Sequence, residues 1–144
     1  MAMQTIWGQV QDKTNICRGV ISVGTASHGG LLLASGYAKK HLLPEIVNLV
    51  PFYNNYFCFE EDCDFNIPLF FIPDLIPKMV KSFWPNLSGQ ELDEKVKKYA
   101  GYTYNAIKRY YESFLNDYPM VVLRFKDYCQ FELNFTDDEM KIFE

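Results

Sequence analysis

The densest group of chemically active side chains is Glu60-Glu61-Asp62-Cys63-Asp64, in which four carboxylates and a thiol occupy consecutive positions. A second unusual segment, Thr25 to Gly30, contains His28, one of only two histidines in the chain. Together the two segments contain acids, a base and two candidate nucleophiles. They match no complete catalytic or metal-binding signature, so they define a candidate site without defining a reaction.

Three interpretations of this site follow from the residue types. His28 and Cys63 are a candidate base and thiolate pair, oriented by an acid such as Asp64. Alternatively, Glu60, Asp62 and Asp64 with His28 hold a hard divalent cation for hydrolysis. The third interpretation is structural and is favoured, because polar clusters at element ends usually satisfy backbone groups. The residues assigned to this cluster are Trp7, Thr25, Ser27, His28, Gly29, Gly30, Glu60, Glu61, Asp62, Cys63 and Asp64.

Composition narrows the functional class. The 144 residues are expected to form a single domain, 1–144. A formal net charge of -4 argues against direct binding of nucleic acid, which requires a basic surface. The four cysteines fit no zinc-binding spacing, and no apolar run approaches the length of a membrane span. No cofactor is expected, and the predicted location is the cytoplasm, where the cysteines would be free thiols.

The chain is predicted to be an α+β protein with a small antiparallel sheet packed against several helices. An N-terminal hairpin and one or two further strands supply the sheet. The expected strands are 5–11, 19–23, 31–33 and 56–59, with residues 12–15 as a turn. His28 is expected in a hairpin loop, whose tight turn uses the positive φ angles that Gly29 and Gly30 allow.

A long amphipathic helix over about residues 89–116 is the clearest element, because apolar residues recur at steps of three and four. Ser88 and Glu91 are expected to form a capping box at its start, and Thr136 and Glu139 to form another before a short terminal helix. Residues 120–125 are a strand candidate. The other helical predictions are 35–48 interrupted by Pro44, 74–84, and Asp64 to Phe71, for which a buried strand over 67–72 is the alternative.

Basic residues alternate with tyrosines on the long helix. Tyr102, Lys108, Arg109 and Tyr111 form a candidate partner surface that could stack on bases or meet an acidic partner. The alternative, favoured by frequency, is the solvated outer face of an amphipathic helix.

Three motifs in the N-terminal half carry a family resemblance. They are Trp7-Gly8-Gln9-Val10-Gln11, Ser22-Val23-Gly24-Thr25-Ala26-Ser27-His28-Gly29-Gly30 and Glu60-Glu61-Asp62-Cys63-Asp64-Phe65. In this order they resemble a family of uncharacterised bacterial domains, the domain of unknown function 7007, whose pattern is WGxVQ, STASHGG and EEDCDW. The resemblance covers residues 6 to 75, with departures at Gly24 and Phe65. It implies an origin on phages, plasmids or other mobile elements, where small proteins often inhibit host defence, CRISPR effectors included.

Two functions are therefore expected, in order of preference. The first is a non-enzymatic, anti-CRISPR-like accessory protein that binds and inhibits a host protein. The second is a small hydrolase or transferase that uses His28 with the Glu60–Asp64 cluster.

Overall fold

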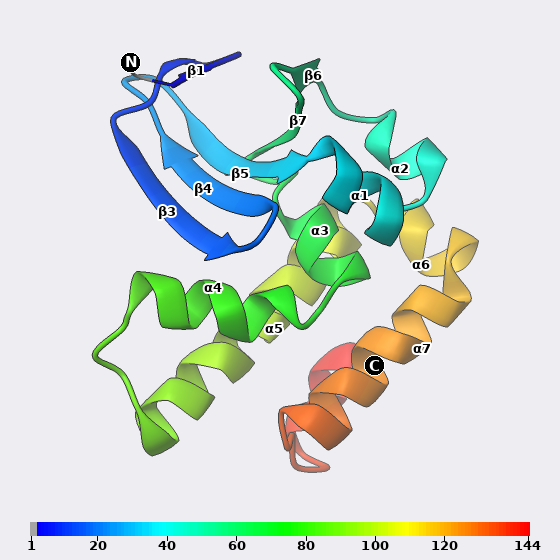
Figure 1. Cartoon of the computed structure of the whole chain (residues 1–144). Coiled ribbons are helices and arrows are strands. Elements are labelled where there is room, and N and C mark those ends of the chain that lie inside the picture. Colours follow the sequence, from blue (N-terminus) through cyan, green and yellow to red (C-terminus); the bar gives the residue numbers. More distant parts are fainter. Residues whose placement is uncertain (1–2) are drawn as a thin grey trace. The chain divides into compact units, whose positions relative to one another are not determined.

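The computed structural model describes residues 3–144 and confirms the α+β class. The chain divides into two compact units, the first ending at Ile67 and the second beginning at Pro68. Antiparallel sheets belong to the first unit, and the second is helical (Figure 1). No helix within residues 3–144 is long and apolar enough to cross a membrane.

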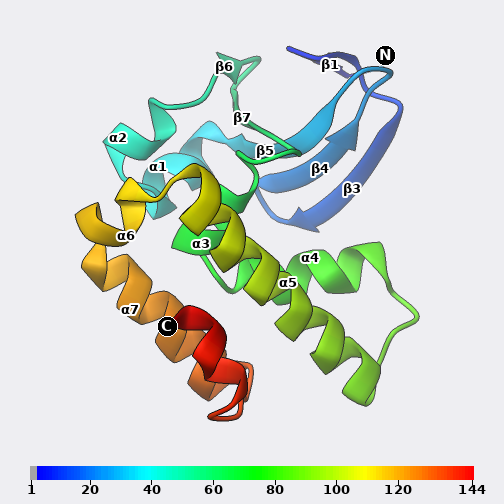
Figure 2. The same cartoon turned by 180° about the vertical axis from the view of Figure 1, so that it is seen from behind.

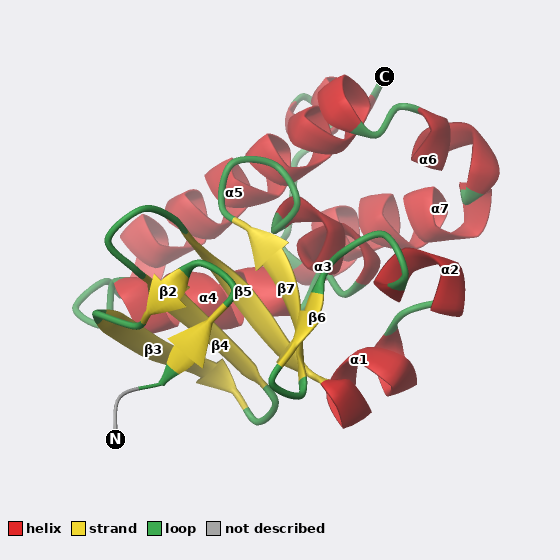
Figure 3. Cartoon of the chain, turned by 90° about the horizontal axis from the view of Figure 1, so that it is seen from above, coloured by secondary structure: helices red, strands yellow, loops and turns green. Residues whose placement is uncertain are grey.

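The larger sheet of the first unit is antiparallel throughout and has the strand order β3-β4-β5-β7-β6 (Figure 3). This sheet has five strands, whereas a hairpin with one or two further strands was predicted. The strands are β3 (Asp12–Cys17), β4 (Val20–Gly24), β5 (Gly29–Ala34), β6 (Phe52–Tyr53) and β7 (Tyr56–Glu60).

The N-terminal prediction was wrong in two places. Residues 5–11 do not form one strand, because β1 (Gln4–Thr5) and β2 (Gly8–Gln9) pair as a separate two-stranded sheet. Residues 12–15, predicted as a turn, lie in β3. β3 is an edge strand with half of its six residues exposed, and an edge tolerates the polar residues that a central strand would exclude.

The core of this unit is built on β5. Leu31, Leu32 and Leu33 are all almost fully buried, which is the pattern of a strand covered on both faces. Leu32 packs with Val23 and Cys58, and Trp7 is among the partly buried side chains against them.

Helices follow β5 in two pieces. Of the two possibilities for residues 35–48, one short helix or two pieces, the structure has two pieces: α1 (Ser35–His41) and α2 (Pro44–Val47), with Pro44 as the first residue of α2. The N-cap of α1 is Ala34. α1 contacts β5 and β7.

Helix, not strand, follows the acidic cluster. α3 (Asn66–Phe71) begins where the carbonyls of Cys63 and Asp64 accept the N–H groups of Asn66 and Ile67, at 3.1 and 2.9 Å. The side-chain amide of Asn66 donates to the same Cys63 carbonyl at 3.2 Å. These bonds explain why Asn66 is polar and yet buried.

The second unit is built from helices (Figure 2). Their bounds are α4 (Leu75–Phe83), α5 (Gly89–Tyr110), α6 (Ser113–Asp117), α7 (Pro119–Asp127), the π-helical segment η1 (Tyr128–Glu132) and the 3-10 segment η2 (Glu139–Phe143).

The long helix ends earlier than predicted. α5 stops at Tyr110 because Tyr111 leaves the helical conformation, with φ -136° and ψ 46°. Ser88 is its N-cap but makes no side-chain capping bond, so the box predicted with Glu91 is not formed. The second box is formed: Thr136 N–H donates to Glu139 Oε1 at 2.9 Å, and Glu139 N–H donates to Thr136 Oγ1 at 3.1 Å.

The strand predicted over 120–125 was wrong, because these residues lie in α7. Pro119 occupies the first turn of the helix, where its missing N–H costs nothing. Phe125, fully buried, packs beside the rings of Tyr104 and Phe143, each with its centroid 6.0 Å away. Figures 1 and 2 both show the terminal segment beside α7. Tertiary packing here outweighs the strand propensity of Val121 and Val122.

Candidate functional site

The loop of the β4–β5 hairpin is organised by the hydroxyl of Thr25. Thr25 Oγ1 accepts the N–H of His28 at 3.1 Å and lies 2.6 Å from the His28 carbonyl oxygen. The Thr25 N–H also donates to that carbonyl, at 2.8 Å. A side chain that bonds its own loop in this way closes a tight turn without glycine in the left-handed region.

The same loop is hydrogen-bonded to the turn of the β1–β2 hairpin. The Trp7 carbonyl accepts from Thr25 Oγ1 at 3.2 Å and from Ser27 Oγ at 3.3 Å. In turn, the Trp7 N–H donates to the hydroxyl of Thr5 at 3.1 Å. Thr25 and Ser27 therefore connect the first two motifs of the sequence, and do so with their backbone-directed hydroxyls.

Gly29 and Gly30 have a role other than the predicted one. Neither has a positive φ angle; both lie in β5. They are needed for space, because a Cβ at Gly30 would overlap the carbonyl oxygen of Phe59 and lie 2.9 Å from the Trp7 ring. A Cβ at Gly29 would lie 2.7 Å from the Val23 carbonyl oxygen. The glycine pair lets three backbone segments approach closely.

The acidic cluster meets this hairpin through β7. Glu60 pairs with Gly30 in the sheet, and its Oε1 lies 3.1 Å from Nδ1 of His28. The Glu61 N–H donates to the Gly29 carbonyl at 2.9 Å. The Glu60 carbonyl accepts the N–H of Phe65 at 2.9 Å, which closes the turn that carries residues 61–64.

The structure does not show the predicted contact between His28 and Cys63. His28 contacts Glu60, whereas the Cys63 thiol lies 3.6 Å from Oδ1 of its neighbour Asp64. The His28 and Glu60 side chains are 51% and 36% exposed, so the pair is a surface contact. Within residues 3–144, no three His, Cys, Asp or Glu residues form a group that could hold a metal ion, and Glu60, Asp62 and Asp64 are no exception.

A surface on α5 brings cations and aromatic rings together. Lys95 Nζ lies 4.3 Å from the ring centroid of Trp84, Lys98 Nζ 5.8 Å from that of Tyr102, and the Arg109 guanidinium 5.3 Å from that of Tyr110. We call this surface the aromatic–cationic stripe. Its members are Trp84, Lys95, Lys98, Tyr99, Tyr102, Arg109 and Tyr110.

Neighbouring rings connect the N-terminal half of the stripe. The Tyr99 ring lies 5.5 Å from Trp84 and 5.8 Å from Tyr102, centroid to centroid. Trp84 comes from the end of α4 and was not predicted, because nothing in the local sequence pattern indicates its contact with Lys95.

Two residues of the predicted partner surface lie apart from the stripe. Tyr111 stacks on Phe114 at 5.1 Å. Lys108 is exposed, but on a helix it lies about 120° around the axis from Tyr102, whereas Arg109 lies within about 20° of it.

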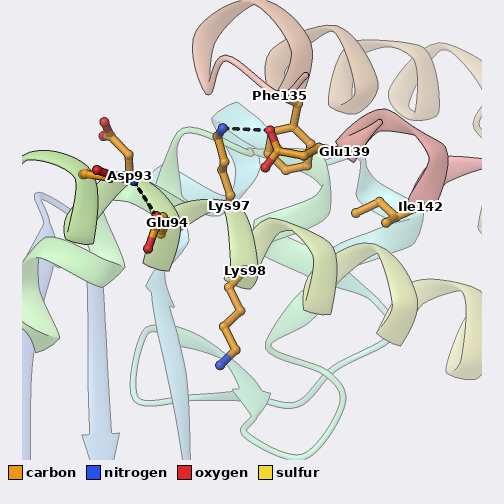
Figure 4. A pocket seen from close by; sticks show the side chains of 8 residues that line it. Asp93, Glu94, Lys97, Lys98, Phe135, Glu139 and Ile142 are labelled. Carbon is orange, nitrogen blue, oxygen red and sulfur yellow. Dashed lines mark hydrogen bonds and ion pairs between the residues drawn. The ribbon is translucent and has the colours of Figure 1, made fainter. Parts of the chain in front are cut away.

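A pocket of about 500 Å³ lies beside the first half of α5 (Figure 4). Lys97 crosses it to Glu139, with Nζ 3.0 Å from Oε1. Figure 4 shows Lys98 pointing away from Glu139. The hydrogen bond from the Thr136 N–H and, to a smaller extent, the contact with Lys97 lower the pKa of the Glu139 carboxyl from its ordinary value. Across this pocket, the ion pair between Lys97 and Glu139 therefore connects α5 to η2.

Comparison with known proteins gives a family and no activity. No curated protein and no solved structure matches the chain. A family model, described as a domain of unknown function, matches residues 1–114. The match extends past residue 75, where the recognisable motifs end, and takes in α4 and α5 with the stripe. The chain therefore belongs to the family of domain of unknown function DUF7007.

Proposed function

We propose that this protein is an accessory protein of a phage or other mobile element that binds and inhibits a host protein, such as a CRISPR effector. The aromatic–cationic stripe is the proposed contact surface, and the partner offers an acidic segment to it. The observation that carries the proposal is that three cations on α5 each lie over an aromatic ring.

Charge supports an acidic partner. From Lys95 to Tyr110, α5 contains five basic residues and no acidic one, although the chain as a whole has a net charge of -4. Of these five, Lys97 is paired with Glu139 and Lys95 is half-buried, whereas Lys98, Lys108 and Arg109 are exposed. A local cationic surface on an acidic protein favours one orientation of approach and one sign of partner.

Side-chain type supports a binding surface as well. Tyr102 and Tyr110 are each more than half exposed, so their rings are available for contact. Tyr, Trp and Arg are the residues that most often dominate the binding energy of protein interfaces. A Lys or Arg already held over a ring loses less side-chain entropy on binding than a free one.

The test compares two charge reversals on the same helix. Lys98→Glu reverses the charge of a stripe residue. Lys108→Glu is the control, the same substitution at an exposed position about 120° around the α5 axis from Tyr102. We expect a host protein retained by the wild type and by Lys108→Glu at micromolar concentration to be lost with Lys98→Glu, and its retention to fall as salt is raised. Equal retention by both variants, or no salt-sensitive partner at all, would contradict the proposal.

A second function is favoured by one observation, the 3.1 Å contact between Nδ1 of His28 and Glu60. A carboxylate on one ring nitrogen orients the other as a base, as a hydrolase or transferase requires. His28→Ala and Asp64→Asn should then abolish biological activity and leave thermal stability nearly unchanged. If both variants lose several kcal/mol of stability, the cluster is structural and this function is refuted.

A further inference from the structure

A second basic feature lies in the first unit. A surface pocket of about 470 Å³ opens between the β3–β4 turn and α1. Its lining residues are Arg18, Gly19, Ala34, Gly36, Tyr37, Lys40 and His41. Three of the seven carry basic nitrogen atoms and none is acidic, which is unusual in a chain with a net charge of -4.

The cations of this pocket lack counter-charges. Within the part of the chain that the structure describes, residues 3–144, neither Arg18 nor Lys40 forms an ion pair. Both side chains are exposed at the rim. Like charges gathered around one cavity repel each other, and a bound anion removes that repulsion.

The walls are held in place by the fold. Ala34, at the end of β5, donates its N–H to the Gly19 carbonyl at 2.8 Å, which ties the β3–β4 turn to the start of α1. Gly19 has a φ of +91°, and a Cβ there would lie 2.9 Å from Cβ of Tyr37. The turn can therefore lie directly against Tyr37 only because residue 19 is glycine.

The aromatic wall is fixed from its other side too. The rings of Tyr37 and His41 are 4.3 Å apart, centroid to centroid, one helical turn from each other on α1. Gly36, another lining residue, is exposed and has no side chain that could narrow the opening. The result is a surface pocket lined by basic residues from two places in the fold, Arg18 in the β3–β4 turn and Lys40 and His41 on α1.

We propose that this pocket binds a small phosphorylated molecule, with Arg18, Lys40 and His41 as its phosphate ligands. The guanidinium of Arg18 matches two phosphate oxygens at once, and the ammonium of Lys40 adds a compact positive charge. The volume lies within the range of small-molecule sites. The site shares no residue with the stripe on α5, so this proposal and the proposed function can each be refuted without the other.

The experiment is a titration of the ¹⁵N-labelled chain, residues 1–144, with inorganic phosphate and with glycerol phosphate, in which amide chemical shifts are followed. We expect saturable shifts at Arg18, Gly19 and Lys40, with a Kd of about 1 mM or tighter for the better ligand. Arg18→Gln with Lys40→Gln should weaken that binding about tenfold or more. Lys39→Gln is the matched control, because Lys39 precedes Lys40 on α1 and lines a different pocket.

Each other result decides against the proposal. Equal weakening by Lys39→Gln would show general attraction of anions to α1, and shifts that do not saturate would show the same. An amide spectrum of each variant confirms that it is folded, so a loss of binding cannot come from unfolding. A final arm uses phosphatidylcholine vesicles with and without phosphatidic acid. Binding to the phosphatidic acid vesicles alone would assign the site to a lipid headgroup and overturn the small-molecule proposal.

Discussion

Substitution of Gly30 by alanine should destabilise the first unit severely, although the change adds a single methyl group. The new Cβ would overlap the Phe59 carbonyl oxygen and lie 3.0 Å from Cα of Glu60, both on the neighbouring strand β7. Backbone atoms cannot rotate away as a side-chain end can, so β5 and β7 would have to separate. We expect a loss of about 3 kcal/mol in the free energy of unfolding, at the upper end of overpacking costs.

Gly36→Ala is the matched control. It is the same chemical change, in α1, at a position where a Cβ meets nothing within 4 Å. Alanine favours a helix over glycine by about 1 kcal/mol, so this variant should gain stability. The two variants should then differ by about 4 kcal/mol, which corresponds to a difference in urea midpoint of about 2 to 3 M.

The assay is urea unfolding followed by tryptophan fluorescence in a Trp84→Phe background. Trp7 is then the single tryptophan and reports on the unit that contains Gly30. Its ring lies against the glycine, so the signal is local to the perturbation. A Gly30→Ala protein within about 0.5 kcal/mol of its parent would refute the close-approach explanation.

Three further predictions concern single side chains. Thr25→Val should cost about 1 to 2 kcal/mol of unfolding free energy in the same assay, because its hydroxyl bonds the loop backbone; an unchanged midpoint would contradict this. Burial raises the pKa of Cys129 to about 12, so native protein at pH 8 should be alkylated at half-buried Cys17 long before Cys129, as mass spectrometry can resolve. The pKa of Glu139 is lowered in the folded protein from its ordinary value of 4.5, so the ionised carboxylate stabilises the fold fully above pH 4.5, and this contribution is lost as the pH falls through the folded pKa. Glu139→Gln lacks this contribution, so its free energy of unfolding should fall less between pH 6 and pH 3 than that of the wild type. The same pH dependence in both proteins would refute this prediction.

The fold could be predicted from sequence wherever the local pattern and the burial agree. The apolar run at Leu31–Leu33 and the apolar periodicity of α5 are examples, and both elements are present. The prediction failed for residues 120–125, where β-branched residues suggested a strand. The reason is the fixed position of Phe125 among the rings of Tyr104 and Phe143, which no local pattern contains.

The candidate site illustrates the same limit. A Gly-Gly pair beside a polar loop suggests positive φ angles, yet Gly29 and Gly30 are strand residues that make room for another strand. Tight turns that do use positive φ lie elsewhere, at Gly19 between β3 and β4 and at Asn54 and Asn55 between β6 and β7. Residue identity alone cannot separate a glycine needed for its φ from one needed for its size, because the second need arises from residues distant in sequence.

The part that Trp84 plays in the stripe could not be predicted from sequence patterns either. Its contact with Lys95 joins the end of α4 to α5 across a loop, so the helical periodicity that revealed Tyr102 and Arg109 could not include it. The stripe is thus a product of helix packing as much as of the α5 sequence.

The most direct test of the proposed function is the affinity of one captured host protein for three forms of this chain. The wild type and Lys108→Glu should bind it equally, and Lys98→Glu with Arg109→Glu should weaken binding at least about a hundredfold, as expected for loss of interface hot spots. Binding by the double variant that matches the wild type within about twofold would contradict the assignment of the stripe as the contact surface.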